Sequence, residues 1–476
     1  MKILLINPPY INFGGVKESG GHAIPLNLLY LAAYLRKKMA CDLSILDAEI
    51  LGFNYAKIEN RIMEEKPDII GITAPTPAMD HVIKISKIIK KINNNCFIVL
   101  GGAHPTAMPK ETAMIDEIDF VVRGEGEITF YELVRAIENN GDFSKIKGIA
   151  FKDKGKIIVT EDRELISDID TLPFPARDLI NFQLYRSAPT KRVSSSNFTT
   201  SIFTSRGCPY NCTYCISKVI WKRGVRFRSP KNVVDEIEEC VKKWGLEEFN
   251  FYDDTFVLNE KRVIEICNEL LNRNIKISWI CFARVNTITE KMLQAIKEAG
   301  CKKISFGLES GSQTILNNIR KNATIEEAKQ AVAIAHKNHL KVHASFMFGN
   351  VGETKETIEM TINFAKSLNL DNATFFIVSP YPGTELYNNA VKEGRIPKDV
   401  KWSDFAPLTN TPPLLIQDTL SGEQLIKYQK KAFAEFYLRP QYLLKKLLLI
   451  RSINDLKLLL NGLTIFKGII FKSPKT

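Results

Sequence analysis

The chain has 476 residues, with 65 Lys and Arg against 53 Asp and Glu, and therefore a formal net charge of +12. Hydrophobic residues make up 45% of it and charged residues 25%, which is ordinary for a globular protein and excludes a disordered, collagen-like or small disulfide-linked chain. A chain of this length is expected to form two or three domains with substantial hydrophobic cores.

The N-terminal residues give no indication of export. The apolar run that ends at Ile6 is followed directly by Asn7, Pro8 and Pro9, so it is too short for a signal peptide. No stretch of about 18 apolar residues predicts a membrane span. We therefore expect a cytoplasmic protein in a reducing compartment, where clustered members of its nine cysteines serve as metal ligands rather than disulfides.

Residues 1–142 alternate apolar, β-branched runs with amphipathic helical patterns. Strands are predicted at 2–7, 43–47, 68–73, 96–101 and 119–122. This alternation indicates an α/β domain with a doubly wound parallel sheet, which binds ligands beyond the carboxyl ends of its strands. Four segments after those ends are rich in Gly, Pro, Thr and His. Any one of them is typical of an ordinary loop, but four at one edge favour a ligand site, with the candidates Thr73, Thr76, Gly101, Gly102, His104 and Glu125.

Residues 143–198 are predicted to form a linker with a hairpin at 148–160 that turns at 152–156. Beyond them, residues 199–420 again alternate strands and helices. The predicted strands lie at 200–205, 248–252, 277–282, 303–307, 341–349 and 373–379. Six such repeats indicate a partial (β/α)6 barrel with its active site at the carboxyl ends of the strands.

Three cysteines on one loop follow the first barrel strand: Cys208, Cys212 and Cys215. Thiolates at these spacings can converge on one iron–sulfur cluster, and three ligands on a four-iron cluster leave one iron open. A zinc site is the alternative, but it needs a fourth ligand, and the nearest later histidine is His336. The remaining barrel cysteines lie singly in apolar patterns, as small buried hydrophobic residues do: Cys240, Cys267, Cys281 and Cys301.

With the aromatic Tyr214 directly before Cys215, this motif resembles that of the radical S-adenosylmethionine (SAM) superfamily. The resemblance implies a [4Fe–4S] cluster whose open iron chelates the amino and carboxylate groups of SAM. It also implies that an external one-electron reductant, such as ferredoxin or flavodoxin, drives cleavage of SAM to methionine and a 5′-deoxyadenosyl radical.

Motifs at the later strand ends resemble segments with which the superfamily contacts SAM. One follows the second strand, one lies in Phe306–Ser312, and one resembles Gly-x-Pro-Gly-Glu-Thr with Val351 in place of proline. Singly, such residues could cap helices or be buried structural carboxylates, and Arg284 could instead pair with Asp254. Their joint placement favours a SAM site made of Asp253, Asp254, Arg284, Glu309, Ser310, Gly349 and Gly352, together with Tyr214 of the cysteine motif.

The N-terminal domain is similar to the cobalamin-binding module that precedes many radical SAM domains. The resemblance implies that the loops with Thr73, Thr76, Gly101 and Gly102 line the nucleotide tail of cobalamin. The mutase-type motif Asp-x-His-x-x-Gly is replaced by residues 7–10, Asn-Pro-Pro-Tyr, so a histidine lower ligand to cobalt is not expected. His104 is then expected to order its loop or to border the cofactor.

Residues 421–476 are predicted to be a basic helical region. Residues 427–476 have eleven Lys and Arg but only two acidic residues, a net charge of +9, so the rest of the chain is nearly neutral. Basic residues interrupt leucine-rich runs, which predicts amphipathic helices. Two interpretations stay open: peripheral contact with the inner face of a membrane, and packing on the barrel. Nucleic acid is disfavoured, because few aromatic residues could stack on bases.

In pattern, the chain is most similar to anaerobic magnesium-protoporphyrin IX monomethyl ester cyclase-like and hopanoid-methylase-like enzymes. We therefore expect an enzyme that cleaves SAM and, with cobalamin, methylates an unactivated carbon of a hydrophobic small molecule or lipid. The alternatives are an oxidative cyclase or C–C bond-forming enzyme of the same family and, in another class, a non-catalytic corrinoid or electron carrier. A methylthiotransferase is disfavoured, because its N-terminal domain needs three more cluster cysteines and this one has only Cys41 and Cys96.

Overall fold

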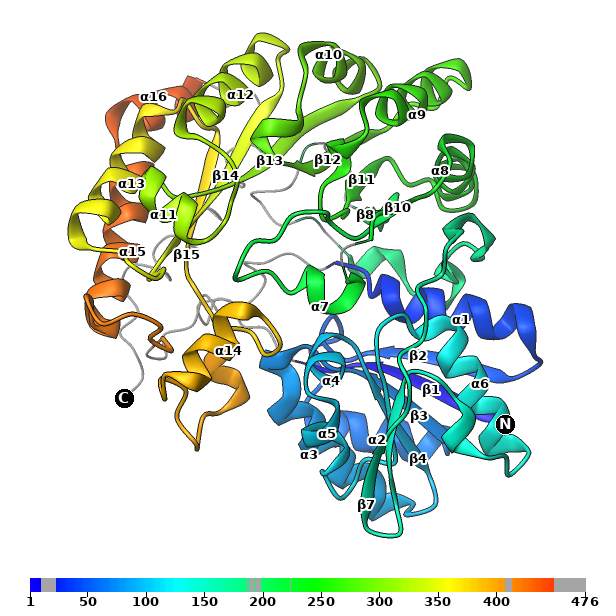
Figure 1. The fold of residues 1–476 in the computed structure, drawn as a ribbon. Coiled ribbons are helices and arrows are strands. Elements are labelled where there is room, and N and C mark those ends of the chain that lie inside the picture. Colours follow the sequence, from blue (N-terminus) through cyan, green and yellow to red (C-terminus); the bar gives the residue numbers. More distant parts are fainter. Residues whose placement is uncertain are drawn as a thin grey trace.

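The computed structural model describes residues 1–9, 23–185, 187, 193, 198–222, 224–406 and 413–448. The predicted linker serines at 194–196 and the end of the basic region, 449–476, lie outside the described residues. Two sheets dominate the described part, one formed within residues 2–159 and the other within residues 199–377, and helices cover both (Figure 1).

The N-terminal sheet has seven strands in the order β2-β1-β3-β4-β5-β6-β7. The first five are parallel and confirm the predicted doubly wound sheet, each within one residue of its predicted start: β1 (Lys2–Asn7), β2 (Asp42–Asp47), β3 (Ile69–Thr73), β4 (Phe97–Gly101) and β5 (Phe120–Val122). The predicted hairpin is also present, as β6 (Ile149–Asp153) and β7 (Lys156–Val159). It pairs antiparallel with β5, so it extends the N-terminal sheet instead of standing apart as a linker.

Alternate side chains of these strands enter two separate cores. Leu4 and Ile6 of β1 pack with the helices on one face, and Ile3 and Leu5 pack with those on the other. Because both faces are covered, the strands are apolar throughout, as the sequence indicated. The helices are α1 (Leu26–Lys38), α2 (Tyr55–Glu65), α3 (Met79–Ile92), the short α4 (Ala103–Ala107) and α5 (Pro109–Ala113), and α6 (Gly126–Glu138).

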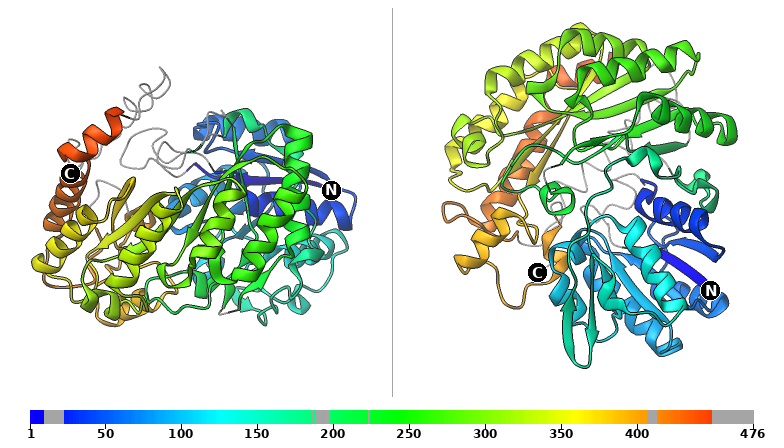
Figure 2. Two further views of the ribbon diagram at one scale, coloured as in Figure 1. Left: turned by 90° about the horizontal axis from the view of Figure 1, so that it is seen from above. Right: turned by 45° about the vertical axis from the view of Figure 1, so that its right-hand side comes forward.

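The second sheet has six parallel strands in the order β15-β14-β13-β12-β11-β8 and confirms the predicted partial barrel. Its strands are β8 (Thr199–Ile202), β11 (Glu248–Phe251), β12 (Ser278–Ala283), β13 (Cys301–Glu309), β14 (Lys341–Phe348) and β15 (Asn372–Ile377). The long helices lie along the outer side of this curved sheet (Figures 1 and 2): α8 (Pro230–Trp244), α9 (Glu260–Asn272), α10 (Glu290–Glu298), α12 (Ile325–Lys337) and α13 (Lys355–Ser367).

The first predicted barrel strand, 200–205, is shorter than expected. The chain leaves the sheet after Ile202, and Ser205–Arg206 (β9) pairs instead with Arg226–Phe227 (β10) in a separate two-stranded ribbon. The physical reason is that the side chain of Asp253 takes the backbone N–H groups of Thr204 and Ser205, which a sheet ladder would otherwise bind.

The C-terminal helices bear on the two interpretations of the basic region. Helix α15 (Gly422–Tyr437) lies against the edge strand β15, where Gln429 donates to the carbonyl of Phe375 at 2.8 Å and the Tyr437 hydroxyl to that of Ala373 at 2.7 Å. This part of the region therefore packs on the barrel. The next helix, α16 (Pro440–Leu448), leaves Leu444 59% and Leu448 74% exposed. None of the helices in the described ranges is long and apolar enough to cross a membrane.

Candidate active site

The cysteine loop lies beyond the carboxyl end of β8, between β9 and the short helix α7 (Ser217–Trp221). Asp253, at the end of β11, holds the start of this loop. Its carboxylate accepts from the Thr204 N–H at 2.8 Å, from the Thr204 hydroxyl at 2.9 Å and from the Ser205 hydroxyl at 2.8 Å. Asp253 was predicted to lie near SAM, and the structure places it beneath the loop, where burial raises the pKa of its carboxyl group.

The three predicted cluster ligands are free thiols on this loop. Cys212 is buried, and Cys208 and Cys215 are partly exposed. Burial is the main cause that raises the pKa of Cys215 to about 12, and Asp254, Cys212 and Cys208 contribute to that rise. All three cysteines belong to the one loop. Thr255 lies beside the first of them, with its hydroxyl oxygen 3.9 Å from Cys208 Sγ.

Arg284, which follows β12, lies against the same loop. Its guanidinium carbon is 3.6 Å from the centroid of the Tyr210 ring, and its Nη1 is 3.6 Å from Cys212 Sγ. Its Nη2 donates to the carbonyl of Lys321. The alternative pairing with Asp254 is not formed, since the Asp254 carboxylate accepts from the Ser217 hydroxyl at 2.6 Å. Asp254 is thus tied to the first residue of α7, and burial raises its pKa.

Glu309 reaches the cysteine loop from the end of β13. A register shift in the β13–β14 ladder between Gly307 and Glu309, and a backbone φ of 65° at Glu309, turn its side chain out of the alternation of the strand. The carboxylate accepts from Lys321 Nζ at 2.7 Å and from the Tyr214 hydroxyl at 3.1 Å. Two predicted SAM residues, Tyr214 and Glu309, are therefore in direct contact. Lys321, which no sequence motif identified, completes the group.

The other predicted SAM residues support loops. The Ser310 hydroxyl is buried against Thr361 of α13 at 3.1 Å and accepts from the Ser312 N–H. Gly349 and Gly352 have positive φ, 89° and 81°, in the turn after β14. Glu353 fills this turn and accepts from the N–H of Gly349 at 2.6 Å, and burial raises its pKa to about 7. For Ser310, Gly349 and Gly352, direct contact with a cofactor therefore stays a prediction.

At the carboxyl edge of the N-terminal sheet, the structure brings most of the predicted residues together. Gly102 has a φ of 107°, and an added Cβ there would lie 3.2 Å from the Ala74 nitrogen. Thr76 Oγ1 is 3.3 Å from Nδ1 of His104, which is buried. Burial also lowers the pKa of His104 to about 4, so its imidazole is neutral near pH 7. Thr73 accepts a hydrogen bond from Asn27 at 2.8 Å.

Sequence reasoning missed a contact from the far end of the chain at this edge. The Trp402 ring meets the His104 ring edge-on, with 4.4 Å between centroids, and the Ser403 N–H donates to Asp80 at 3.2 Å. Trp402 follows the last barrel strand, so a segment of the second domain covers the edge of the first. No motif in the sequence marks Trp402 for this role.

Glu125 lies apart from the other predicted residues of this domain and contacts arginines of the second domain. Its carboxylate is buried in ion pairs with Arg206 and Arg226, at 2.6 Å each, and Glu127 pairs with Arg206 at 2.5 Å. Arg206 lies two residues before Cys208. The loop after β5 therefore contacts the cysteine loop directly.

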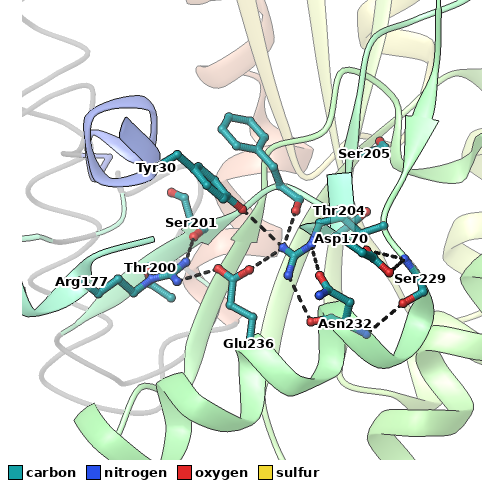
Figure 3. Close-up of polar contacts among 12 residues, drawn as sticks. Tyr30, Asp170, Arg177, Thr200, Ser201, Thr204, Ser205, Ser229, Asn232 and Glu236 are labelled. Carbon is teal, nitrogen blue, oxygen red and sulfur yellow. Dashed lines mark hydrogen bonds and ion pairs between the residues drawn. The ribbon is translucent and has the colours of Figure 1, made fainter. Parts of the chain in front are cut away.

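A second buried group of charges joins the two domains (Figure 3). Arg177, from the segment between the sheets, lies 2.6 Å from Glu236 of α8, and Arg228 pairs with the same carboxylate. Arg228 also lies 3.4 Å from the hydroxyl of Tyr30, which belongs to α1. Burial alone would raise the pKa of Glu236, but the two guanidinium groups lower it, so one carboxylate stays charged between two arginines.

Comparison with known proteins identifies both domains. The Radical SAM superfamily model matches residues 202–365, and the B12 binding domain model matches residues 14–134. The uncharacterized methyltransferase PH0819 of Pyrococcus horikoshii is 38% identical over 447 residues, which cover 94% of each chain. The anaerobic magnesium-protoporphyrin IX monomethyl ester cyclase of Rubrivivax gelatinosus is 32% identical over 451 residues, 93% of this chain and 78% of that protein. The chain belongs to the cobalamin-binding radical SAM family.

Solved structures share the fold of this cobalamin-binding radical SAM enzyme. The methyltransferase TsrM from Kitasatospora setae, with cobalamin and a [4Fe–4S] cluster bound, matches with a TM-score of 0.67 at 18% identity, over 82% of this chain and 75% of that one. OxsB, with aqua-cobalamin and SAM bound, matches with a TM-score of 0.65 at 19% identity, over 90% of this chain and 61% of that one. Both likenesses concern the whole two-domain arrangement.

Family membership implies a [4Fe–4S] cluster and SAM, and three free thiols on one loop are the donor set that such a cluster takes. In a cubane cluster the three thiolates bind separate iron ions, so Cys208, Cys212 and Cys215 need only surround one cluster.

The B12 binding domain implies cobalamin, and the carboxyl edge of the N-terminal sheet fits it. Gly102 lets two loops of this edge meet closely, since an added Cβ would lie 3.3 Å from the Thr73 hydroxyl and 3.2 Å from the Ala74 nitrogen. At the end of β1, where mutase-type domains have their cobalt-binding motif, Asn7 donates to Asp47 at 2.9 Å. Residues 7–10 read Asn-Pro-Pro-Tyr, so this stretch of the sequence has no imidazole to offer to cobalt.

Proposed function

We propose that this enzyme methylates an unactivated carbon of a small hydrophobic molecule. The observation that carries the proposal is the direct contact between the two cofactor domains: Arg206, beside the cluster loop, pairs with Glu125 at the ligand edge of the cobalamin domain. Two cofactor sites held together in this way serve one substrate between them. The names of two relatives support methyl transfer, PH0819 and, at 26% identity, the cytidylyl-2-hydroxyethylphosphonate methyltransferase of Streptomyces wedmorensis.

When bound, the cluster with SAM supplies a carbon-centred radical for hydrogen abstraction, and cobalamin supplies a methyl carrier. The protein's own residues bind and orient the cofactors and the substrate, and they exclude water from the site. Cys208, Cys212 and Cys215 would hold the cluster. Glu309, kept in place by Lys321, presents a carboxylate beside Tyr214 and is suited to bind a polar group of SAM. A radical SAM enzyme also needs an external one-electron reductant, for which ferredoxin or flavodoxin is the proposed partner.

Cyclisation is the second candidate, because cyclases are also among the relatives. The Rubrivivax gelatinosus cyclase is 32% identical, and that of Cereibacter sphaeroides 30%. The two reactions differ in their products. Methyl transfer from SAM leaves S-adenosylhomocysteine, whereas a cyclase leaves only 5′-deoxyadenosine and methionine. A non-catalytic carrier is disfavoured by the complete radical SAM domain.

The test is an anaerobic reconstitution with iron, sulfide, cobalamin and a reductant, followed by incubation with SAM and candidate lipids or tetrapyrroles. We expect 5′-deoxyadenosine and S-adenosylhomocysteine together with a product heavier by one methylene unit. The variant with Cys208, Cys212 and Cys215 all changed to Ala should lose the iron–sulfur absorbance, and Cys41→Ala is the matched control. Absence of 5′-deoxyadenosine from the intact protein would refute the radical reaction, and absence of S-adenosylhomocysteine alone would favour the cyclase.

We also propose that the basic C-terminal region contacts an anionic membrane and delivers the hydrophobic substrate. Leu444 and Leu448, one helical turn apart on α16, are exposed, and residues 449–476 continue the leucine-rich, basic composition. Deletion of 449–476, which leaves the packed helix α15 intact, should reduce binding to phosphatidylserine vesicles at least several-fold. Phosphatidylcholine vesicles are the control, and unchanged binding to anionic vesicles would contradict the proposal.

A further inference from the structure

Arg206 forms a buried contact between the two cofactor domains. It is 7% exposed and directs one terminal nitrogen to Glu125 Oε1, at 2.6 Å, and the other to Glu127 Oε1, at 2.5 Å. Its guanidinium group also lies near two aromatic rings, with its central carbon 5.3 Å from the centroid of Tyr30 and 5.6 Å from that of Trp221. A guanidinium group that is bound on both terminal nitrogens and contacts two rings has little freedom to move.

One of the two carboxylates that receive Arg206, that of Glu125, is held by further partners. Glu125 Oε2 accepts from Arg226 Nη1 at 2.6 Å and from the Ile166 N–H at 2.7 Å. Two arginines therefore face two glutamates, and the buried group is neutral as a whole. Burial of matched charges of this kind contributes little net stability, but it strongly disfavours any arrangement in which one charge loses its partner. A buried charge group of this kind therefore fixes how the two domains are placed relative to each other.

The contact of Arg206 with the two glutamates joins the loop of the cluster site to the ligand edge of the cobalamin domain. Glu125 and Glu127 stand where β5 ends and α6 begins, at the ligand edge of the cobalamin domain. Arg206 ends β9 and is followed by Gly207 and then Cys208. At Gly207, φ is 97°, and an added Cβ would lie 2.0 Å from the carbonyl oxygen of Gly224. The backbone between Arg206 and the first cluster ligand is therefore closely packed.

We propose that Arg206 is a positioning residue that sets the distance and orientation between the cluster site and the cobalamin site by docking on Glu125 and Glu127. The inference rests on the two cofactors of the family and is independent of the substrate. With the contact intact, the radical forms next to the methyl carrier. With the contact loosened, SAM cleavage continues but is less tightly coupled to methyl transfer.

The experiment compares Glu127→Gln and Arg206→Lys with Glu132→Gln in the cofactor-loaded protein. Glu132 is on the same helix as Glu127 but pairs with Arg163, and it does not reach the cysteine loop. Iron content and cobalamin content first establish that each variant is loaded. Pulsed electron paramagnetic resonance then measures the magnetic coupling between the reduced cluster and cob(II)alamin, which depends on their distance and needs no substrate.

We expect Glu127→Gln and Arg206→Lys to retain both cofactors, to broaden or shift that coupling, and to raise the ratio of 5′-deoxyadenosine to methylated product at least threefold. Glu132→Gln should match the wild type. A coupling in Glu127→Gln and Arg206→Lys equal to that of the wild type would overturn the proposal. If the wild type makes no methylated product, the proposed function fails, while the magnetic measurement still decides whether Arg206 positions the two sites.

Discussion

The guanidinium group of Arg284 points at the thiol of Cys212, with 3.6 Å between Nη1 and Sγ. The same side chain rests on the Tyr210 ring and binds the Lys321 carbonyl, so it is held from three directions. A fixed cation beside one ligand of an iron–sulfur cluster favours the reduced, more negative form of that cluster. Arg284 is thus placed to tune the electron transfer that starts the reaction.

We predict that Arg284→Met makes the reduction potential of the cluster more negative. A charge at this distance in a partly buried site contributes on the order of 1–2 kcal/mol, which is roughly 50–100 mV for one electron. A redox titration followed by electron paramagnetic resonance measures it. Arg320→Met, which removes an arginine that pairs with Glu385 on the surface, is the control. If Arg284 binds SAM instead, the potential will stay the same and SAM affinity will fall.

Gly207 gives a second test of the cysteine loop. Ala at this position combines a disfavoured positive φ with a Cβ 2.0 Å from the Gly224 carbonyl oxygen, so the loop must move. We expect Gly207→Ala to bind less than half of the wild-type iron after reconstitution. Gly155→Ala is the matched control, because Gly155 has a φ of 79° in the β6–β7 turn and open space around it. That variant should cost about 1 kcal/mol and keep its iron.

The parallel strands were predictable because their signal is local. Runs such as Leu4–Ile6 and Ile98–Leu100 are apolar and recur between amphipathic helices, so the fold follows from the sequence pattern. The cysteine motif was predictable for the same reason, since its three cysteines lie within eight residues. Among the residues predicted to bind SAM, the contact of Tyr214 with Glu309 joins two motifs that are visible in the sequence.

The contacts between domains were not predictable, because each needs two residues far apart in the chain. Glu125 was identified in a glycine-rich loop and assigned to cofactor binding, yet nothing in that loop indicates that Arg206, 81 residues later, takes its carboxylate. Trp402 and Lys321 belong to no motif. The β6–β7 hairpin was predicted correctly, but whether a hairpin extends a sheet depends on the free edge of β5.

The buried carboxyl group of Glu353 should make the free energy of unfolding decrease as the pH rises. Its pKa is raised to about 7 by burial, against about 4.3 in an unfolded chain. Between these values the folded state holds a proton that the unfolded state releases, so stability falls as pH rises from about 4.5 to 7. The loss is on the order of 3 kcal/mol above pH 7. Glu353→Gln keeps an acceptor for the N–H groups of Gly349 and Asn350 without this loss.

We therefore expect Glu353→Gln to melt roughly 5–10 °C above the wild type at pH 8, and the two proteins to converge near pH 4.5. Differential scanning calorimetry of the transition that includes the barrel measures this. Glu356→Gln, exposed in the first turn of α13 and three residues after Glu353, is the control and should leave the wild-type dependence unchanged over this pH range. If the melting temperature of Glu353→Gln falls with rising pH as steeply as that of the wild type, the titrating group is not Glu353.

The buried imidazole of His104 should have the opposite effect in the cobalamin domain, whose stability should decrease as the pH falls. Burial lowers its pKa to about 4, against about 6.5 when unfolded. Between these values the unfolded state binds the extra proton, so stability is complete above about pH 6.5 and falls as pH decreases toward 4. The loss is on the order of 3 kcal/mol. Because the His104 ring meets Trp402 at 4.4 Å, the charge arises where the second domain covers the ligand edge.

We expect acidification from pH 7 to 4.5 to lower the melting temperature of the wild-type N-terminal domain by several degrees more than that of His104→Gln. His339→Gln, at an exposed turn, is the control and should follow the wild type. Cobalamin affinity should fall over the same pH range in the wild type, since a charged His104 is unfavourable in its buried position and should open the edge that Thr76 and Trp402 form around it. Equal pH dependence of melting in the wild type and His104→Gln would contradict this assignment, because it would place the titrating group elsewhere in the domain.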